Sequence, residues 1–431
     1  MAALASNHVD LTPPTGGGVL VGLSGGLDSI ALLHVLAASH EIRARGLRAI
    51  HVHHGLHRDA DAWTMHCQRV CDELAVPLAI VRIEVERDSG EGLEAAARKV
   101  RHAAFEAELR EEEVLALAHH RDDQAETFLL RALRASGPDG LGAMRAWRRF
   151  GRGWLWRPLL GVPRSELLAY AQQHALHWID DPSNADTDLD RNFLRHRVMP
   201  LLRERWPGAE AAFAQSATLS AETSELLAEG DALALASART LDAHTLARDT
   251  LRALPPARRG RVLRLWIATL GLPPLPAEGV ARIEAELLDA RVDAEPEFAW
   301  HGATVRLWRD LLHAGRQRRP LPSDWDAAWD GATPLRLPTG DTLALQGAAG
   351  FDAPLRVHAR QGGERITLPR RAHSHALKHV LQDFGVPPWV RERLPLLSNA
   401  AGAVMAAGDL VYSAEFDTWL HAHGARLAWS D

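Results

Sequence analysis

The stretch Ser24-Gly25-Gly26-Leu27-Asp28-Ser29 combines residue types that could bind and position a phosphate group. Two adjacent glycines allow backbone conformations and close approaches that a side chain would forbid. Successive backbone N–H groups at such a turn, beside a helix N-terminus, form a cradle for phosphate oxygens. The apolar run before the turn predicts a buried strand, and the pattern that begins at Asp28 or Ser29 predicts a helix. The stretch lacks the Gly-Lys-Ser/Thr ending of a Walker A loop.

This stretch resembles the PP-loop of the ATP pyrophosphatases, which split ATP between the α and β phosphates and adenylate a substrate. The resemblance implies an ATP site, whereas a plain strand-to-helix turn is the structural alternative. The residues expected to contact the nucleotide are Ser24, Gly25, Gly26, Leu27, Asp28 and Ser29.

Two carboxylates lie three residues apart in the stretch 122–127, directly after a predicted strand. Asp123 and Glu126 fall on the first turn of a predicted helix, so their side chains share one face. At the end of a strand in the nucleotide-binding sheet, they are placed to hold Mg²⁺ or a substrate ammonium group. Acidic residues also favour helix N-termini, so capping is the alternative interpretation, and it stays open for Asp122.

Three arginines are placed to meet an anion. Arg191 and Arg195 lie four residues apart, so both guanidinium groups can point at one anion, although a solvated helix face remains the alternative. Arg98 follows Glu94 at the same spacing, which by itself is typical of a solvated ion pair.

Histidines and cysteines do not predict a metal site. His51, His53 and His54 have no cysteine or Glu-x-x-His partner, so a loop near the nucleotide is the favoured interpretation. Cys67 and Cys71 lie four apart on one predicted helix and are expected to be buried rather than reactive.

Strand-like and helical segments alternate from Val19 to about Trp156, which predicts a parallel sheet covered on both faces. Ligands bind beyond the carboxyl ends of such strands, where the unusual residues of this chain lie. The predicted strands are Val19–Gly22, Leu47–Val52, Leu78–Val85 and Val114–Ala118. The predicted helices are Asp28–Ser39, Ala60–Leu74, Leu93–Leu109 and Asp122–Arg134.

Composition limits the class of protein. A chain of 431 residues suggests two to four domains. A net charge of −6 argues against a generally basic nucleic-acid binder, yet residues 355–395 hold eight basic and three acidic residues around Trp389, which suits RNA. The sequence shows neither a membrane-spanning run nor a signal-peptide pattern, and the two cysteines form no disulfide framework, so a cytoplasmic protein is expected.

The expected fold is an α/β parallel-sheet PP-loop domain, then a mainly helical middle domain and a small α+β C-terminal domain. The expected boundaries are 1–208 for the ATP-binding catalytic domain, 209–320 for a mainly helical domain, 321–353 for a linker and 354–431 for the C-terminal domain.

Further motifs, in this order along nearly the whole chain, resemble those of the tRNA(Ile)-lysidine synthase family. They are His-Val-His-His-Gly-Leu (51–56), Glu-Ala-Ala-Ala-Arg (94–98), Asp-Asp-Gln-Ala-Glu-Thr (122–127), Ser-Gly-Pro-x-Gly-Leu-x-Ala-Met (136–144), Asp-Arg-Asn-Phe-Leu-Arg (190–195) and Val-Pro-Pro-Trp-Val-Arg (386–391). One departure is Ala118, where many members have glycine; it removes no reactive group.

The resemblance implies an enzyme that uses ATP and Mg²⁺ to adenylate the wobble cytidine of tRNA(Ile) with anticodon CAU and then joins free L-lysine to C2 of that base. Asp28 would help to hold Mg²⁺, and Arg98 would contact the nucleotide. Asp123 and Glu126 resemble the carboxylates that recognise lysine, and one of them is the expected base. Arg191 and Arg195 would hold phosphate near the reacting base.

Other classes of function remain open. A tRNA thiolase would require reactive or zinc-binding cysteines, and a small-molecule PP-loop ligase would not require the basic C-terminal patch. An RNA-binding protein with an inactive nucleotide site is the non-enzymatic alternative. The sequence also leaves a homodimer open.

Overall fold

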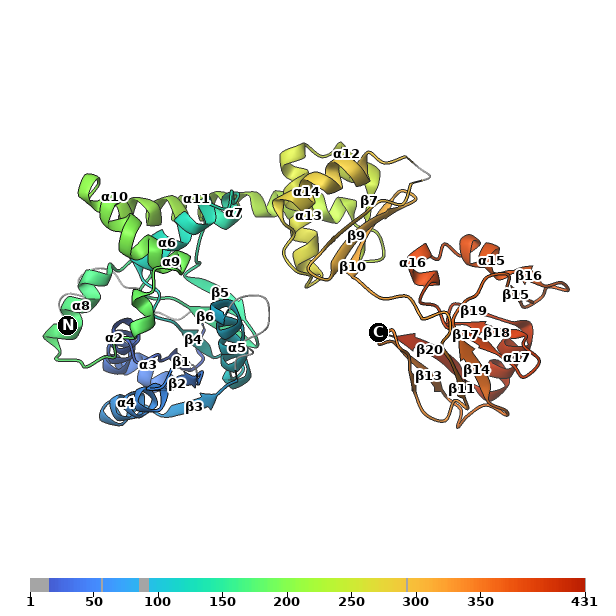
Figure 1. The fold of residues 1–431 in the computed structure, drawn as a ribbon, viewed down its shortest axis with the longest axis horizontal. Helices are drawn as coiled ribbons and strands as arrows, with labels where there is room; N and C mark the ends of the chain where they lie inside the picture. Colours follow the sequence, from blue (N-terminus) through green and yellow to red (C-terminus); the bar gives the residue numbers. More distant parts are fainter. Residues whose placement is uncertain (1–14, 56, 85–92, 292–293, 431) are drawn as a thin grey trace. The chain divides into compact units, whose positions relative to one another are not determined.

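The structure is a computed structural model that describes residues 15–55, 57–84, 93–291 and 294–430. The chain divides into two compact units, Met1–Gly230 and Asp231–Asp431 (Figure 1).

A six-stranded sheet forms the centre of the first unit. Its strands are β1 (Val19–Gly22), β2 (Leu47–His53), β3 (Leu78–Arg82), β4 (Val114–Ala116), β5 (Trp147–Phe150) and β6 (Gly153–Trp156). They are arranged in the order β3-β2-β1-β4-β6-β5. All neighbours are parallel except β5, which pairs antiparallel with β6. The parallel sheet predicted from the alternating pattern is therefore confirmed.

Helices cover both faces of this sheet. They are α2 (Leu27–Ala38), α3 (His40–Arg45), α4 (Ala60–Glu73), α5 (Leu93–Glu108) and α8 (Arg164–Gln173). Successive side chains of a strand point to opposite faces, so Val19 and Val21 pack in the cluster with α2, α3, α4 and α8, whereas Leu20 packs in the cluster with α5. In Figure 1 α5 lies on one side of the strands and α2, α3 and α4 lie on the other.

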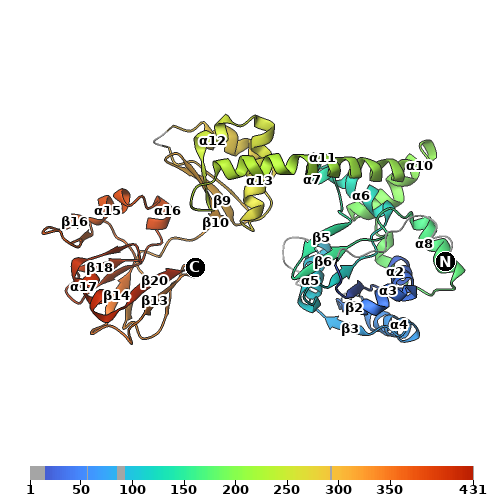
Figure 2. The same cartoon turned by 180° about the vertical axis from the view of Figure 1, so that it is seen from behind.

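A second group of helices lies after β4 in the sequence. They are α6 (Arg121–Ala132), α7 (Pro138–Leu141), η1 (Pro182–Ala185), α9 (Asp190–Phe193), η2 (Leu194–Val198), α10 (Met199–Arg205) and α11 (Ala209–Ala238). The helix α11 is continuous along its length (Figure 2). It contacts α6 through the stacked rings of Phe128 and Phe213, whose centroids are 5.8 Å apart. The segment η2 is π-helical, a widened turn that is frequently found at functional sites.

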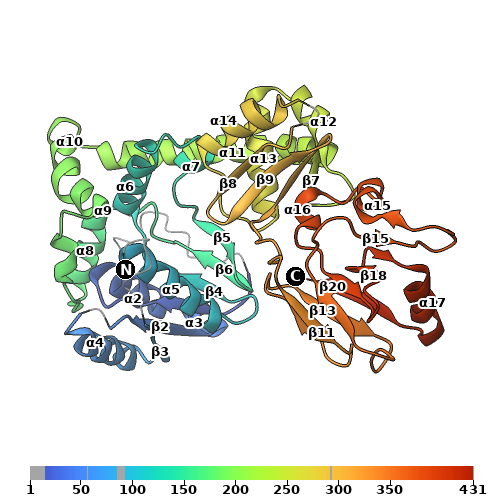
Figure 3. The same ribbon diagram turned by 45° about the vertical axis from the view of Figure 1, so that its right-hand side comes forward.

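The second unit begins with helices packed on a small sheet. Its elements here are β7 (Thr245–Ala247), α12 (Arg248–Ala253), α13 (Pro256–Thr269), α14 (Ala277–Arg282), η3 (Ile283–Leu288), β8 (Glu297–Trp300), β9 (Ala303–Trp308) and β10 (Leu311–Arg316). The strands form an antiparallel sheet in the order β7-β10-β9-β8 (Figure 3). The fully buried Trp266 belongs to the core shared by the helices and this sheet.

The expectation of a mainly helical middle domain over 209–320 is therefore wrong in part, because this segment also contains a four-stranded sheet. The alanine- and leucine-rich stretch before residue 290 has the spacing of apolar residues that predicts helices, and the expectation extended this structure to residue 320. The strands that follow are short, and each is stabilised by its partners rather than by its own propensity.

The C-terminal part is built mostly of strands. They are β11 (Asp326–Trp329), β12 (Leu335–Arg336), β13 (Thr342–Gln346), β14 (Leu355–His358), β15 (Arg365–Ile366), β16 (His375–Ala376), β17 (Leu396–Ser398), β18 (Val404–Ala407), β19 (Val411–Tyr412) and β20 (Arg426–Ser430). The helices are α15 (Leu377–Asp383), α16 (Pro388–Arg391) and α17 (Ala414–His423).

These strands form sheets in the orders β11-β14-β17-β18-β19, β12-β13-β20 and β15-β16. Residues 321–353, expected as a linker, thus supply strands to the C-terminal sheets: β11 pairs with β14, and β13 pairs with β20. The short length of these strands and their distant partners explain why the local sequence did not assign them to the C-terminal sheets.

No helix in the described parts of the chain is both long enough and apolar enough to cross a membrane.

Candidate active site

The turn between β1 and α2 has the conformation that its glycines predict. Gly25 has a φ of +87°, and a Cβ atom there would lie 2.9 Å from the Cδ1 atom of Ile179 and 3.1 Å from the Sγ atom of Cys67. Glycine is therefore required both by the backbone conformation and by the close approach of these side chains. The N-cap residue of α2, Gly26, makes no side-chain cap, so the first N–H groups of this 12-residue helix are available to a ligand.

Two hydroxyl groups stabilise the turn from inside. The Oγ atoms of Ser24 and Ser29 are 3.0 Å apart, and the Ser29 hydroxyl donates to the Gly26 carbonyl oxygen at 3.0 Å. The backbone N–H of Ser24 also donates to the Ser29 Oγ atom. The loop is thus held in shape before any ligand binds.

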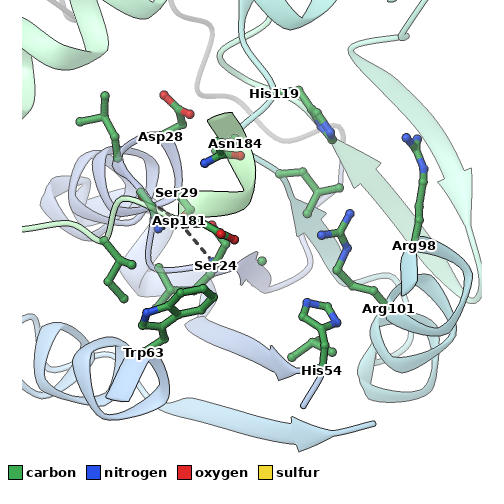
Figure 4. Close-up of a pocket in the computed structure, with 18 of the residues that line it drawn as sticks. Ser24, Asp28, Ser29, His54, Trp63, Arg98, Arg101, His119, Asp181 and Asn184 are labelled. Atoms are coloured by element: carbon green, nitrogen blue, oxygen red, sulfur yellow. Dashed lines mark hydrogen bonds between the residues drawn. The ribbon is translucent and has the colours of Figure 1, made fainter. Parts of the chain in front are cut away.

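A cavity of about 390 Å³ opens beside this loop at the carboxyl ends of the strands (Figure 4). All of the predicted PP-loop residues except Gly25 line it, and Gly25 lies behind them against Ile179 and Cys67. Arg98 and Arg195 also line it, whereas Asp123, Glu126 and Arg191 are not among its lining residues.

Arg98 lies across the cavity from the PP-loop, on α5, next to Arg101 (Figure 4). The side chain of Glu94, which the spacing would pair with Arg98, lies outside the described residues.

Several cavity residues were not singled out from the sequence. They are Trp63, Arg101, His119, Arg164, Asp181 and Asn184, whereas His54, which also lines the cavity, was expected in a loop near the nucleotide. Asp181 and Asn184 belong to a turn that follows α8 in the sequence, and the hydrogen bond from the Ile179 N–H to the Gly25 carbonyl brings that turn to the PP-loop. His119 carried a signal, because it follows a strand whose carboxyl end lies at this edge of the sheet, as His54 does.

The two predicted carboxylates do share one face of α6, and a guanidinium group joins them. Arg195 donates from Nε to Glu126 Oε1 at 2.7 Å and from Nη2 to Glu126 Oε2 at 2.9 Å. The same Nη2 donates to Asp123 Oδ1 at 2.9 Å. Glu126 is 2% exposed and Asp123 is 9% exposed, so these are buried charges. The capping alternative also holds for Asp123, whose Oδ2 accepts the N–H of His120 at 3.1 Å.

Arg191 reaches the Glu126 carboxylate as well, as its spacing from Arg195 predicted. Its Nε lies 3.3 Å from Glu126 Oε2, and its Nη2 donates to the Thr127 hydroxyl at 2.7 Å. The anion on which both arginines converge in this structure is therefore a carboxylate of the chain.

A second cavity, of about 690 Å³, is lined in part by residues of this cluster. Glu126 and Asp122 line it, and Arg164 and Arg195 border both this cavity and the one beside the PP-loop. The cluster thus borders both cavities.

Asp28 faces the nucleotide-side cavity from the first turn of α2. Its Oδ2 lies 3.7 Å from His120 Nε2, and its Oδ1 lies 3.8 Å from Arg164 Nε. Burial raises the pKa of Asp28 in spite of these cations. The Oδ1 atom is buried without a hydrogen-bond partner among the described residues, so it is ready to accept a ligand.

This carboxylate suits Mg²⁺. No group of three or more histidine, cysteine, aspartate or glutamate side chains gathers as a metal site in the described part of the chain. Mg²⁺ at phosphate-transfer sites is commonly held by one or two carboxylates together with phosphate oxygens and water. The free Oδ1 atom of Asp28, beside a phosphate-binding turn, fits that donor set.

His120 lies between these groups and is 1% exposed. Burial lowers the pKa of its imidazole, but the carboxylates of Asp122, Asp123 and Asp28 outweigh burial and raise it. Burial raises the pKa of Asp122, but the hydrogen bonds and charge of His120 and the backbone N–H of Arg164 lower it to about 2. The Arg164 N–H donates to Asp122 Oδ2 at 2.9 Å.

The cysteines are structural, as expected. Cys67 and Cys71 are free and buried, and burial raises the pKa of both thiols to about 12. Thiols that stay protonated do not serve as nucleophiles.

Three family models match the chain. A PP-loop domain matches residues 4–202, a TilS substrate binding domain matches residues 246–313, and a TilS substrate C-terminal domain matches residues 355–429.

Curated relatives match over nearly the whole chain. The chain is 57% identical over 420 residues to the tRNA(Ile)-lysidine synthase of Xanthomonas axonopodis pv. citri, covering 97% of this chain and 94% of that protein. It is 52% identical to the enzyme of the same name from Xylella fastidiosa strain 9a5c, covering 97% and 96%. It is 44% identical to the one from Pseudomonas aeruginosa, covering 89% and 88%.

Solved structures match parts of the chain. The U34-tRNA thiolase NcsA from Methanococcus maripaludis aligns with a TM-score of 0.38 at 20% identity, covering 48% of this chain and 73% of that chain. A crystal structure of a TILS C-terminal domain aligns with a TM-score of 0.19 at 19% identity, covering 25% and 97%.

The pKa of Asp122 predicts how stability changes with pH. A carboxyl group with a pKa of about 2 in the folded chain and 3.8 when unfolded stabilises the fold above pH 4, and this contribution disappears as the pH falls through 2. The variant Asp122→Asn should therefore lose about 2 kcal/mol of unfolding free energy at pH 7, and the difference should shrink below pH 4. Chemical denaturation at pH 7, 4 and 3 measures it. Asp190→Asn, which changes an exposed carboxylate, is the control; a pH-independent deficit for Asp122→Asn would contradict the assignment.

Proposed function

The chain belongs to the tRNA(Ile)-lysidine synthase family, and from this membership we propose how its residues carry out the reaction. The enzyme is an ATP-dependent ligase. It joins free lysine to C2 of the wobble cytidine of tRNA(Ile) with anticodon CAU, through an adenylated cytidine, and releases pyrophosphate and AMP. The product base, lysidine, reads AUA instead of AUG.

The PP-loop and Asp28 would bind the triphosphate. Backbone N–H groups of residues 24–29 and the hydroxyls of Ser24 and Ser29 would surround the pyrophosphate that leaves in the first step. Mg²⁺, held by the free Oδ1 atom of Asp28, would neutralise charge on that leaving group. Arg98, across the cavity, would contact the nucleotide.

Asp123 and Glu126 would bind the ε-ammonium group of lysine. The observation that supports this most is that both carboxylates already hold a cation, the guanidinium of Arg195, through three hydrogen bonds of 2.7 to 2.9 Å. A buried pair of carboxylates that binds one side-chain cation has the charge and donor geometry to bind an ammonium group. Glu126 also lines the second cavity, through which a free amino acid could reach it.

Lysine would then exchange with Arg195. The Arg195 guanidinium already takes both oxygens of Glu126 and one oxygen of Asp123, so we infer that its side chain moves off to let the ammonium group reach both carboxylates. Because Arg195 also lines the nucleotide-side cavity, the anions of bound nucleotide and tRNA would receive it there. Arg191 would remain on Glu126 or follow Arg195 towards phosphate.

The amine must lose a proton before it attacks C2. Burial raises the pKa of Glu126 in spite of the neighbouring arginines, which makes it the better base of the two carboxylates. We propose that the Glu126 carboxylate accepts the proton of the ε-ammonium group as the lysine nitrogen approaches the adenylated base.

The chain downstream of the catalytic domain would bind the tRNA body in the cytoplasm. The matched substrate-binding and C-terminal domains support this assignment. The C-terminal part also exposes basic side chains at Arg370, Arg371 and Lys378. We assign residues 1–208 to catalysis and residues 209–320 and 321–431 to tRNA binding. A homodimer remains compatible with this division.

The variant Asp28→Ala should bind tRNA but lose adenylation, by at least the roughly 10²–10³-fold typical of removing one electrostatic stabiliser. Release of pyrophosphate in the presence of tRNA and tRNA binding are the two measurements. Asp188→Ala, which alters an exposed carboxylate of the same unit, is the matched control. Near-normal pyrophosphate release by Asp28→Ala would remove this residue from the site.

The variant Glu126→Gln should raise the lysine KM by roughly 10-fold or more, because a charge-assisted contact with the ammonium group is lost. ATP binding should stay close to that of the unmodified enzyme. Lysine-dependent turnover and the affinity for an ATP analogue are measured in parallel, with the exposed Glu225→Gln as the control. If the lysine dependence does not change, Glu126 serves only to stabilise the helix.

A chain that ends at residue 320 should bind tRNA more weakly and with a smaller dependence on salt, since fewer counterions are released. The truncation removes residues 321–431 together, because β11 and β13 pair with strands of the C-terminal sheets and would lose their partners in a shorter deletion. Binding to tRNA from 50 to 300 mM salt measures the slope. A slope equal to that of the full chain would mean that these residues do not contact RNA.

A further inference from the structure

The imidazole of His120 lies between the two halves of the proposed site. Its Nε2 is 3.4 Å from Asp123 Oδ2 and 3.7 Å from Asp28 Oδ2. Asp28 belongs to the nucleotide half, and Asp123 belongs to the lysine half. Among the basic side chains in the described part of the chain, His120 is the one with ion-pair distances below 4 Å to both carboxylates.

The backbone holds His120 rigidly at this place. It is the N-cap residue of α6 and lies shortly after the end of β4 in the sequence. Its own N–H donates to Asp123 Oδ2 at 3.1 Å. Its carbonyl accepts the N–H of Gln124 at 3.1 Å. With an exposed fraction of 1%, the ring has no room to turn away from the carboxylates.

Polar atoms around the ring are left incompletely satisfied. His120 Nδ1 and Asp28 Oδ1 are buried without a hydrogen-bond partner among the described residues, and Nδ1 is 3.7 Å from Asp122 Oδ2. Buried polar atoms normally find partners, so the Asp28 Oδ1 atom, which borders the nucleotide-side cavity, indicates an arrangement completed by a ligand. Contacts at catalytic sites are often long without substrate and tighten in the complex.

We propose that His120 is a positioning residue that fixes Asp28 and Asp123 relative to each other, so that nucleotide and lysine are held in one geometry. This inference rests on the proposed function of Asp123 as a lysine ligand. It gives His120 no contact with either substrate. The role is carried by the Nε2 atom, which faces both carboxylates.

Two substitutions separate positioning from packing. His120→Leu fills a similar volume but removes both ring nitrogens. His120→Gln places an amide nitrogen close to the position of Nε2 and so restores a donor to the two carboxylates. The kinetic constants are measured for pyrophosphate release with tRNA and for lysine-dependent product formation, each on protein shown by circular dichroism to be folded.

We expect His120→Leu to lose roughly 10-fold or more in pyrophosphate release and to gain a similar factor in lysine KM, the size expected when a contact to charged groups is removed. His120→Gln should recover most of both losses. Glu126→Gln, measured beside them, should change only the lysine-dependent step.

The inference is overturned if folded His120→Leu changes only thermal stability, if it changes only one of the two steps, or if His120→Gln is impaired as strongly as His120→Leu. If His120→Leu does not fold, the test depends on His120→Gln alone. The inference is supported if this variant keeps the constants for pyrophosphate release and for lysine-dependent product formation within about threefold of the unmodified enzyme. It is overturned if only one of the two steps is impaired. An unchanged lysine KM in Glu126→Gln would instead contradict the proposed lysine site itself. This result does not depend on any His120 variant.

Discussion

The buried ion pairs of Arg195 with Glu126 and Asp123 constrain the whole catalytic unit. Two carboxylates that are 2% and 9% exposed are costly to bury unless a cation satisfies them. Removing one partner of such a buried pair typically costs about 3–5 kcal/mol, because the other charge is left uncompensated. The position of the π-helical turn that carries Arg195 against α6 is therefore set by charge as well as by packing. The same pairing explains how the site remains folded before lysine arrives.

The topology of the sheet brings the two halves of the site together. β1 pairs directly with β4 in parallel, so their carboxyl ends lie side by side. The PP-loop follows β1, and the segment with His120, Asp123 and Glu126 follows β4. Asp28 and Asp123 thus approach one buried imidazole although they are 95 residues apart in the chain. In the proposed mechanism, nucleotide chemistry and lysine binding would depend on one another through this arrangement.

Local sequence patterns predicted the elements well wherever the signal was itself local. The strand, the Gly-Gly turn and the helix around Ser24–Ser29 follow from spacing and from residue types, and the shared face of Asp123 and Glu126 follows from helix geometry. The spacing of Arg191 and Arg195 correctly indicated one anion for both. It could not reveal that this anion is a carboxylate of the same chain, since a guanidinium group binds carboxylate and phosphate with similar geometry. Contacts between distant segments, such as the 179–184 turn against Gly25 and β13 against β20, left no local signal.

The most direct test of this account is the structure of the chain bound to lysine and a non-hydrolysable ATP analogue. The account predicts that the lysine Nζ atom lies about 2.8 Å from carboxylate oxygens of both Asp123 and Glu126. It also predicts that the Arg195 guanidinium has left Glu126 for the nucleotide side. Lysine bound at another position, with the three hydrogen bonds of Arg195 unchanged, would contradict the exchange on which the proposed mechanism depends.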